Sequence, residues 1–230
     1  MEISLTAIVP VFNEENTIVK SVSNLLKQNI ITEVFIVDDA STDSSLKLIK
    51  EIEEKSEKIK IFQSDSISNM GKGYSITRVA NYVKTDYVVI HDADLEYSPN
   101  DIASMHNLIN DNRDNLILGS RFLKDNKIQK YYRTFFANKF LSFLFSVTYN
   151  KTITDIATCY KMFPSIYFQN TQFVEKGFAI EVELVAKFLK FSKNITEVPI
   201  SYQGRSYKEG KKIKFLDGFK YIFSIIKYKV

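Results

Sequence analysis

The 230-residue chain has one cysteine, no tryptophan, seven glycines and four prolines. A single cysteine, Cys159, excludes an internal disulfide framework and a cysteine-based zinc site, and it is typical of a reducing compartment. No apolar run reaches the roughly 20 residues that a membrane-spanning helix needs. The first residues also lack the charged segment and cleavage site of a secretory leader. We therefore expect a cytoplasmic protein without a membrane-spanning segment, and the composition leaves a peripheral position on the cytoplasmic face of a membrane open.

Charge of one sign does not dominate, because the chain has 31 basic and 27 acidic residues and a formal net charge of +4. This excess is too small to indicate nucleic acid, although it suits an anionic ligand or an anionic membrane surface. Arginine is scarce, with five residues among the 31 basic ones. Where such a lysine-rich chain still uses arginine, the planar guanidinium is favoured for its geometry.

Short apolar segments alternate with helical patterns through the first half of the chain. Segments 5–11, 34–37, 59–62, 87–90 and 116–118 are typical of buried strands, and apolar residues recur at helical spacing between them. This alternation predicts an α/β fold with a mostly parallel central sheet flanked by helices. Further helices are expected at 131–149 and 178–191, and a strand at 195–202. We expect one domain over residues 1–205 and a basic, amphipathic helix within 206–230.

Polar residues follow three of these strands at the point where each strand ends. Asn13 and Glu14 follow the first strand, Asp39 the second, and Asp92 and Asp94 the fourth. Ligands of open parallel sheets bind at the carboxyl ends of the strands. The three segments are therefore expected to meet in one site.

The pair Asp92 and Asp94 is the most informative of these signals. Two carboxylates one residue apart at a strand end can share a hard cation with diphosphate oxygens, and Glu96 could join them. Such a cation would neutralise charge as a nucleoside diphosphate departs. The alternative is a solvated turn, which the position after a buried strand disfavours.

Two further segments could meet a nucleotide. Gly71-Lys72-Gly73 precedes a helical pattern, where free backbone N–H groups and a lysine suit phosphate, although a flexible helix entry is an equal alternative. Asp39 could accept hydrogen bonds from a base or a ribose, or could serve the following helix near its start.

Taken together, these motifs resemble family 2 glycosyltransferases of the GT-A fold, and most closely the branch of dolichyl-phosphate mannosyltransferases and polyprenyl-phosphate glycosyltransferases. The matching segments run nearly the whole length of the chain in order: Ile8 to Glu15, Val37 to Asp43, Gly71 to Gly73, Asp92 to Glu96, Gly119 to Arg121, Thr154-Asp155, Tyr202 to Arg205 and Glu209 to Lys212. The resemblance implies an inverting, metal-dependent transfer of a hexose from a UDP- or GDP-sugar.

The resemblance also assigns site residues. It implies a nucleotide-sugar site formed by Pro10, Val11, Asn13, Glu14, Asp39, Lys72, Asp92, Ala93, Asp94 and Arg205. It places Mg²⁺ or Mn²⁺ on Asp92, Asp94 and Glu96, and relatives often have glutamine where Glu96 stands. Arg121, Arg133 and Arg205 fall near positions where related enzymes bind acceptor and donor phosphates, although surface salt bridges are the alternative.

Asp155 matches an acidic residue near the acceptor in relatives. It would act as the general base for a hydroxyl acceptor, or would only position a phosphate acceptor, which needs no strong base. A helix cap is the alternative. Neither histidine is expected to act directly, His106 because it lies within a helix and His91 because it could only support Asp92.

We expect a polyprenyl or dolichyl phosphate as the acceptor, in keeping with a role in cell wall biogenesis, and a hydroxyl of a cell-surface glycan as the alternative. A sugar nucleotidyltransferase is disfavoured because Phe12 to Glu15 stand where its Gly-rich loop would be, and a non-catalytic relative because both aspartates are present. A processive polysaccharide synthase is also disfavoured, because the Gln-x-x-Arg-Trp signature of that group needs a tryptophan and this chain has none. The helices at 131–149 and in the tail either pack on the core or lie on a membrane surface.

Overall fold

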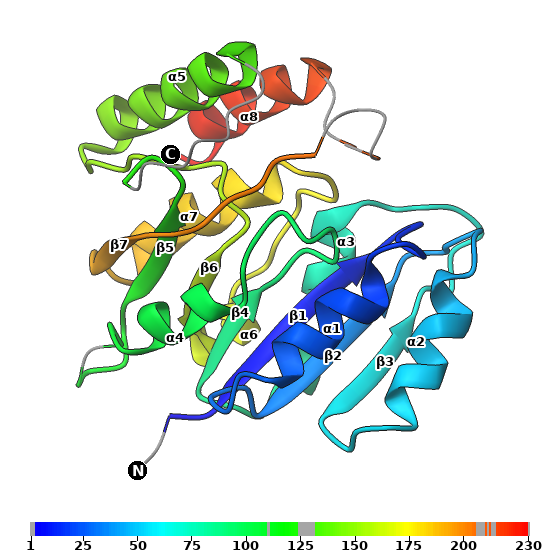
Figure 1. Ribbon diagram of the computed structural model, residues 1–230. Coiled ribbons are helices and arrows are strands. Elements are labelled where there is room, and N and C mark those ends of the chain that lie inside the picture. The colour runs from blue at the N-terminus through cyan, green and yellow to red at the C-terminus, as the bar shows by residue number, and fades with distance from the viewer. Residues whose placement is uncertain are drawn as a thin grey trace.

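The computed structural model describes residues 3–109, 111–123, 132–205, 210, 212 and 215–229. Seven strands form one sheet in the order β3-β2-β1-β4-β6-β5-β7 (Figure 1). The strands are β1 (Leu5–Val11), β2 (Glu33–Asp38), β3 (Ile59–Gln63), β4 (Tyr87–Ile90), β5 (Leu116–Ser120), β6 (Lys161–Pro164) and β7 (Ile195–Pro199). The predicted α/β fold with a mostly parallel sheet is confirmed, since only β6 runs antiparallel to its neighbours β4 and β5.

The first half of the chain forms the alternation of strands and helices that its sequence pattern predicts. Helices α1 (Ile18–Leu26) and α2 (Ser45–Glu53) connect β1, β2 and β3, and α1 and α2 pack against each other. Helix α3 (Lys72–Thr77) and a 3₁₀ turn, η1 (Ala80–Tyr82), return the chain to β4 beside β1. The apolar residues of β1 are buried on both faces of the sheet, as continuous strand patterns of parallel sheets require.

The second half is less regular. Helix α4 (Asn100–His106) leads to β5, and α5 (Tyr132–Tyr149) follows. Helix α6 (Ser165–Asn170) comes directly after β6, and α7 (Ile180–Phe191) precedes β7. The last helix is α8 (Phe215–Lys227). Helix α4 ends at His106, and the described residues that follow form turns before β5.

Helices α5 and α8 lie side by side at one end of the molecule, where they contact each other (Figure 1). Helix α8 also packs against α7, which joins this pair to the central sheet. None of the helices in the described ranges combines the length and apolarity needed to span a bilayer.

Candidate active site

The three polar strand ends do meet at one edge of the sheet, and each turns sharply. Strands β1, β2 and β4 are neighbours, so their carboxyl ends lie together. Each is followed by one non-glycine residue in the left-handed region, Asn13 (φ 51°), Ala40 (φ 59°) and Leu95 (φ 63°). This conformation costs free energy for residues with a side chain and is concentrated at functional sites.

The segments after β1 and β2 hold each other in place. The Asn13 carboxamide oxygen accepts a hydrogen bond from the Thr42 backbone N–H (2.8 Å). Buried Asp39 accepts hydrogen bonds from the backbone N–H groups of Met70 (3.0 Å) and Gly71 (2.7 Å), which fixes the entry to α3. One carboxylate oxygen of the adjacent Asp38 is buried, and no described residue donates a hydrogen bond to it. Hydrogen bonds therefore hold the predicted nucleoside-binding residues in place at this edge of the sheet.

Lys72, at the start of α3, is held between two carboxylates. Its ammonium group lies 2.7 Å from Asp92 Oδ1 and 2.7 Å from Glu181 Oε1, and its side chain is 8% exposed. Burial opposes the charged form, but the charges of Asp92 and Glu181 raise the pKa of Lys72 well above its usual value. Lys72 also lowers the pKa of Asp92 against the effect of burial. Both groups are therefore charged at neutral pH.

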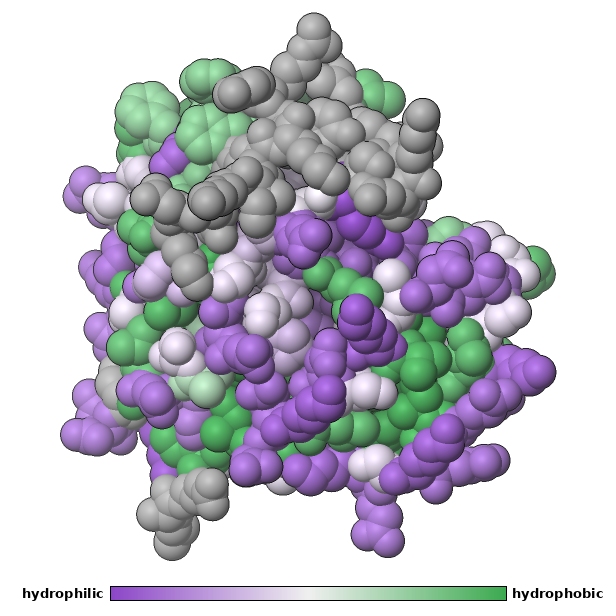
Figure 2. Space-filling model, in the orientation of Figure 1, coloured by the Kyte–Doolittle hydropathy of each residue, from purple (hydrophilic) through white to green (hydrophobic). Residues whose placement is uncertain are grey.

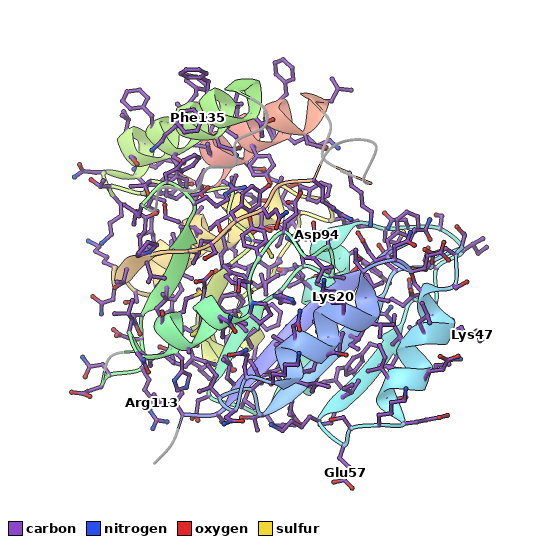
Figure 3. All side chains as sticks on the ribbon, in the orientation of Figure 1. Lys20, Lys47, Glu57, Asp94, Arg113 and Phe135 are labelled. Carbon is purple, nitrogen blue, oxygen red and sulfur yellow. The ribbon has the colours of Figure 1, made fainter. Side chains whose placement is uncertain are left out.

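Asp94 has a different environment, in which negative charge accumulates. Burial, then Asp92 and Glu96, raise the pKa of Asp94 to about 7, while Arg205 opposes this rise. The Arg205 guanidinium lies 3.1 Å from Asp94 Oδ2 and also donates to both oxygens of Glu14 (2.9 and 3.1 Å). In Figure 3, Asp94 lies at the upper edge of the sheet, on the side of the molecule where α5 and α8 lie. This edge therefore gathers acidic groups around one arginine.

The cluster of Glu14, Arg205 and Lys212 ties the C-terminal part of the chain to the end of β1. Lys212 Nζ lies 2.6 Å from Glu14 Oε1. Burial would raise the pKa of Glu14, but Arg205 and Lys212 lower it below its usual range. Arg205 Nε is buried and has no hydrogen-bond partner among the described residues, so the guanidinium keeps donor capacity toward a ligand.

Glu96 contributes differently from the sequence prediction. Its carboxylate accepts hydrogen bonds from the Tyr202 hydroxyl (2.9 Å) and the Arg205 backbone N–H (2.6 Å). Within the described residues, no group of three or more His, Cys, Asp or Glu side chains is arranged to hold a metal ion. The role of Glu96 as a ligand stays a prediction, and in this structure Glu96 positions the segment that carries Arg205.

Asp92 and Asp94 still suit a hard divalent cation. Both side chains are partly accessible, at 22% and 15%, and their oxygens are the donors that Mg²⁺ and Mn²⁺ prefer. Burial, followed by repulsion from Asp92 and Glu96, raises the pKa of Asp94, and a bound dication would relieve the repulsion. Two carboxylates are too few for a closed protein site, so the remaining positions would need ligand oxygens.

Arg121 and Asp155 form a buried pair with each other. Arg121 Nε and Nη2 donate to the two Asp155 oxygens at 2.7 Å each, and the Arg121 backbone N–H also donates to Asp155 (3.0 Å). Asp155 is fully buried, and Arg121 lies over the ring of Tyr202 (5.0 Å). The structure thus brings the two predicted acceptor residues together. Asp155 can act as a base only if this pair opens, and its catalytic role stays a prediction.

The remaining predicted residues lie at or near the same edge, with one exception. Pro10 and Val11 are the last residues of β1, and Ala93 is buried between the two aspartates. Arg133 falls in the first turn of α5, and its side chain lies outside the described residues. Lys211 and Lys214, from the basic cluster of the tail, also lie outside them.

The two histidines make hydrogen-bond contacts within the fold. His91 is buried between Ser21 Oγ (3.0 Å) and the Tyr160 hydroxyl (3.0 Å), and burial lowers its pKa to about 4. His106 ends α4, and its Nε2 lies 3.0 Å from the Ile3 carbonyl oxygen. His91 therefore braces the end of β4 in its neutral form.

Sequence reasoning missed Glu181 and Lys161. Glu181, in the first turn of α7, lies between Lys72 and Lys161, whose Nζ is 2.6 Å from Glu181 Oε2. Both side chains are buried, with exposures of 2% for Glu181 and 0% for Lys161. Burial lowers the pKa of Lys161, and Glu181 opposes this. The only signal in the sequence was a glutamate and a lysine within otherwise apolar segments.

Comparison with known proteins agrees with this geometry. The family model described as glycosyl transferase family 2 matches residues 6–170. An uncharacterized protein of Methanocaldococcus jannaschii is 26% identical over 91% of this chain and 94% of its own length. The UDP-N-acetylglucosamine–dolichyl-phosphate N-acetylglucosaminyltransferase of Methanococcus voltae is 27% identical over 97% of this chain and 95% of its own length.

Solved structures show the same fold. Glucosyl-3-phosphoglycerate synthase from Mycobacterium tuberculosis, crystallised with Mn²⁺, UDP-glucose and phosphoglyceric acid, superposes with a TM-score of 0.75 at 14% identity, over 99% of this chain and 80% of that one. Mannosyl-3-phosphoglycerate synthase from Rubrobacter xylanophilus gives 0.74 at 14% identity, over 99% and 73%. The predicted resemblance is confirmed, because the family model covers most of the sheet and both aspartates. The chain is a glycosyltransferase that belongs to family 2.

Proposed function

We propose that this glycosyltransferase moves a hexose from a UDP- or GDP-sugar to a polyprenyl or dolichyl phosphate, with inversion at the anomeric carbon. The observation that carries the proposal is the pairing of Asp92 with Lys72 and of Asp94 with Arg205 at the end of β4. Carboxylates and cations stand next to each other there, as a metal–diphosphate group requires. The Methanococcus voltae relative, which matches over nearly its full length, supports the lipid phosphate as acceptor.

In this proposal the chain's own side chains bind and orient the donor. Asp92 and Asp94 would hold Mg²⁺ or Mn²⁺, which supplies charge neutralisation on the diphosphate. Lys72 and Arg205 would each exchange a carboxylate partner for a phosphate oxygen. Arg205 Nε, which has no partner in the part of the chain that the structure describes, is a further donor. The edge formed by exposed Asn13 and buried Asp39 would receive the nucleoside.

The reaction then needs little proton transfer. An acceptor phosphate oxygen forms the new bond to the anomeric carbon as the bond from that carbon to the diphosphate breaks. Because a phosphate oxygen is already a competent nucleophile, a strong base is not required. Arg121, held rigid by Asp155, would position the acceptor rather than activate it.

The proposal is tested by donor and acceptor panels. UDP- and GDP-sugars are incubated with Mn²⁺ and with a short-chain polyprenyl phosphate, 3-phosphoglycerate or a free sugar as acceptor, and released nucleoside diphosphate is measured. We expect release that depends on the polyprenyl phosphate and on Mn²⁺. Release that needs a sugar acceptor or 3-phosphoglycerate and ignores the lipid would refute the proposed acceptor.

The site assignment has its own matched variants. Asp94→Asn should lower metal-dependent release at least about a hundredfold, in the range typical for loss of one group that stabilises transition-state charge. Asp65→Asn, which changes an exposed carboxylate after β3, is the control and should leave the rate unchanged. Full metal-dependent activity of Asp94→Asn would show that the metal site lies elsewhere.

The proposed location follows from the acceptor. A lipid phosphate lies in a membrane, and the described helices include none able to cross one. We therefore propose that the protein works at the cytoplasmic surface of the membrane.

A further inference from the structure

Helices α5 and α8 are apolar on two sides. Their inner faces pack on the core through Leu141, Phe145, Tyr221 and Ile225, all at most 6% exposed. Their outer faces carry eight exposed large apolar side chains, which we call the α5–α8 face: Phe136 (66%), Phe140 (55%), Phe143 (65%), Val147 (65%), Leu216 (69%), Phe219 (59%), Phe223 (65%) and Ile226 (61%). A surface helix of a water-soluble domain normally turns a polar face outward.

The eight side chains form one surface rather than two separate ones. Helices α5 and α8 contact each other, and the Tyr149 hydroxyl donates to the Ile225 carbonyl oxygen (3.1 Å). Figure 2 shows apolar residues gathered over α5 at the top of the molecule, and Figure 3 shows aromatic side chains standing off the same helix. Contiguous exposed apolar surface of this kind marks a docking site.

The exposed charged side chains of the two helices are basic, and two of them pair with carboxylates, Lys220 with Asp217 (3.4 Å) and Lys227 with Glu175 (3.0 Å). Helix α5 contains no acidic residue, and the single acidic residue of α8, Asp217, is 16% exposed. Among the described residues, the exposed charged side chains here are all lysines. Lys139 lies on α5, Lys220 and Lys227 lie on α8, and Lys229 follows α8. Large apolar side chains flanked by lysine are the pattern of a helix that lies in the interface of an anionic membrane. A second copy of the chain would bring the same positive charge against itself.

The other side of α8 packs against α7, the helix that carries Glu181. Burial raises the pKa of the Tyr221 phenol, Glu181 adds to the rise, and Lys72 and Arg121 oppose it. Asp94 lies on the same side of the molecule as the two helices (Figure 3). A ligand whose head group enters the site can therefore have its apolar part near the α5–α8 face.

We propose that the α5–α8 face docks on the surface of an anionic lipid bilayer, with the phenylalanine rings in the acyl boundary and the lysines at the head groups. The inference deepens the proposed lipid acceptor. Docking itself requires no sugar transfer, so the two can fail separately.

The experiment is co-sedimentation of the full chain with vesicles of phosphatidylcholine, with and without phosphatidylglycerol, in the absence of donor. We expect binding that is stronger to the anionic vesicles. The variant Phe136→Ser/Phe140→Ser/Phe143→Ser should lose at least about tenfold in partition, because three rings no longer leave water. The control Ile67→Ser/Ile166→Ser/Val174→Ser removes exposed apolar side chains elsewhere and should bind like the unaltered chain.

Circular dichroism and thermal melting check that all variants fold. Vesicle binding that is unchanged in the α5 variant would overturn the proposal, and so would the absence of binding by the unaltered chain. Sedimentation equilibrium tests whether a second copy of the chain occupies the face instead. A dimer that dissociates with the same three substitutions and does not bind vesicles would assign the face to a second copy. Vesicle binding without sugar transfer to any polyprenyl phosphate would support the docking surface and refute the proposed acceptor.

Discussion

Replacing Glu181 by glutamine tests whether the buried network around Lys72 is arranged as the structure shows. The carboxylate of Glu181 faces two ammonium groups, Lys161 at 2.6 Å and Lys72 at 2.7 Å. Lys72 keeps Asp92 as a partner after the substitution. Lys161 keeps only carbonyl oxygens, of Ile156 (3.2 Å) and Thr158, among the partners that the structure records.

The expected cost follows from this loss of partner. Removing one member of a buried ion pair destabilises a protein by about 3–5 kcal/mol, because the other charge stays buried. We expect Glu181→Gln to lower the free energy of unfolding by about 3 kcal/mol at pH 7. The deficit should shrink at alkaline pH, since the pKa of Lys161 is already lowered by burial and an unpaired Lys161 can fold neutral.

Urea unfolding of a double-mutant cycle measures the effect. Lys161→Met should cost less than Glu181→Gln, because Glu181 keeps Lys72 as a partner. The double variant Lys161→Met/Glu181→Gln should be more stable than Glu181→Gln alone by at least about 1 kcal/mol, since the stranded charge is gone. A Glu181→Gln chain within about 1 kcal/mol of the unaltered one, or a double variant less stable than both singles, would refute the reasoning.

Three further predictions concern other parts of the molecule. His91 has a pKa of about 4 in the folded protein, whereas in the unfolded chain it takes up a proton below about pH 6.5. The free energy of unfolding should therefore fall by about 3 kcal/mol between pH 7 and pH 4. Urea unfolding of a His91→Gln chain should lack this part of the pH dependence. Asp155→Asn should cost about 3 kcal/mol by removing the carboxylate paired with buried Arg121, and Arg121→Met in the same chain should restore part of this loss. Simple additivity of the two effects would contradict the pairing. Gly73→Ala should lower the melting temperature strongly because its Cβ would lie 2.1 Å from a backbone oxygen, and Gly177→Ala, with open space around it, should not.

The regular part of the fold could be predicted from the sequence because each element there carries its own signal. Strand β4 matches the predicted segment 87–90, and β1 matches 5–11, because both are unbroken apolar runs between polar segments. Strand β6 was not predicted. It has four residues, one of them the buried Lys161, and it becomes a strand only because β4 and β5 leave a place between them.

Some residues of the candidate site could likewise be predicted from the sequence, and others could not. Asp92, Asp94 and Asp39 could be found because strand ends of a parallel sheet meet at one edge, so local signals are enough to bring them together. Glu181 could not, since a glutamate in the first turn of a helix is usually solvated. Its burial depends on Lys72 and Lys161, which lie 109 and 20 residues away along the chain and approach it only in the folded protein.

The tail helix shows why a list of apolar residues does not settle a function. The sequence pattern of residues 215–226 predicted an amphipathic helix that either packs on the core or meets a membrane. In the structure Ile225 is buried and Leu216, Phe219, Phe223 and Ile226 are exposed, so one helix presents apolar residues to both sides. The two interpretations were therefore not exclusive.

The cations at the site explain how a metal and a diphosphate can be bound together. Asp92 and Asp94 are paired with Lys72 and Arg205, so opposite charges already balance within the edge. A metal ion alone would have to displace these cations and leave them buried, and a diphosphate alone would meet the carboxylates. A metal–diphosphate unit brings both signs of charge, so the carboxylates can turn to the metal while Lys72 and Arg205 turn to phosphate. For the proposed reaction we therefore expect Mn²⁺ and UDP or GDP to bind cooperatively, each tightening the other by the same factor in calorimetric titration. Equal affinity for the nucleotide with and without the metal would contradict this exchange of partners.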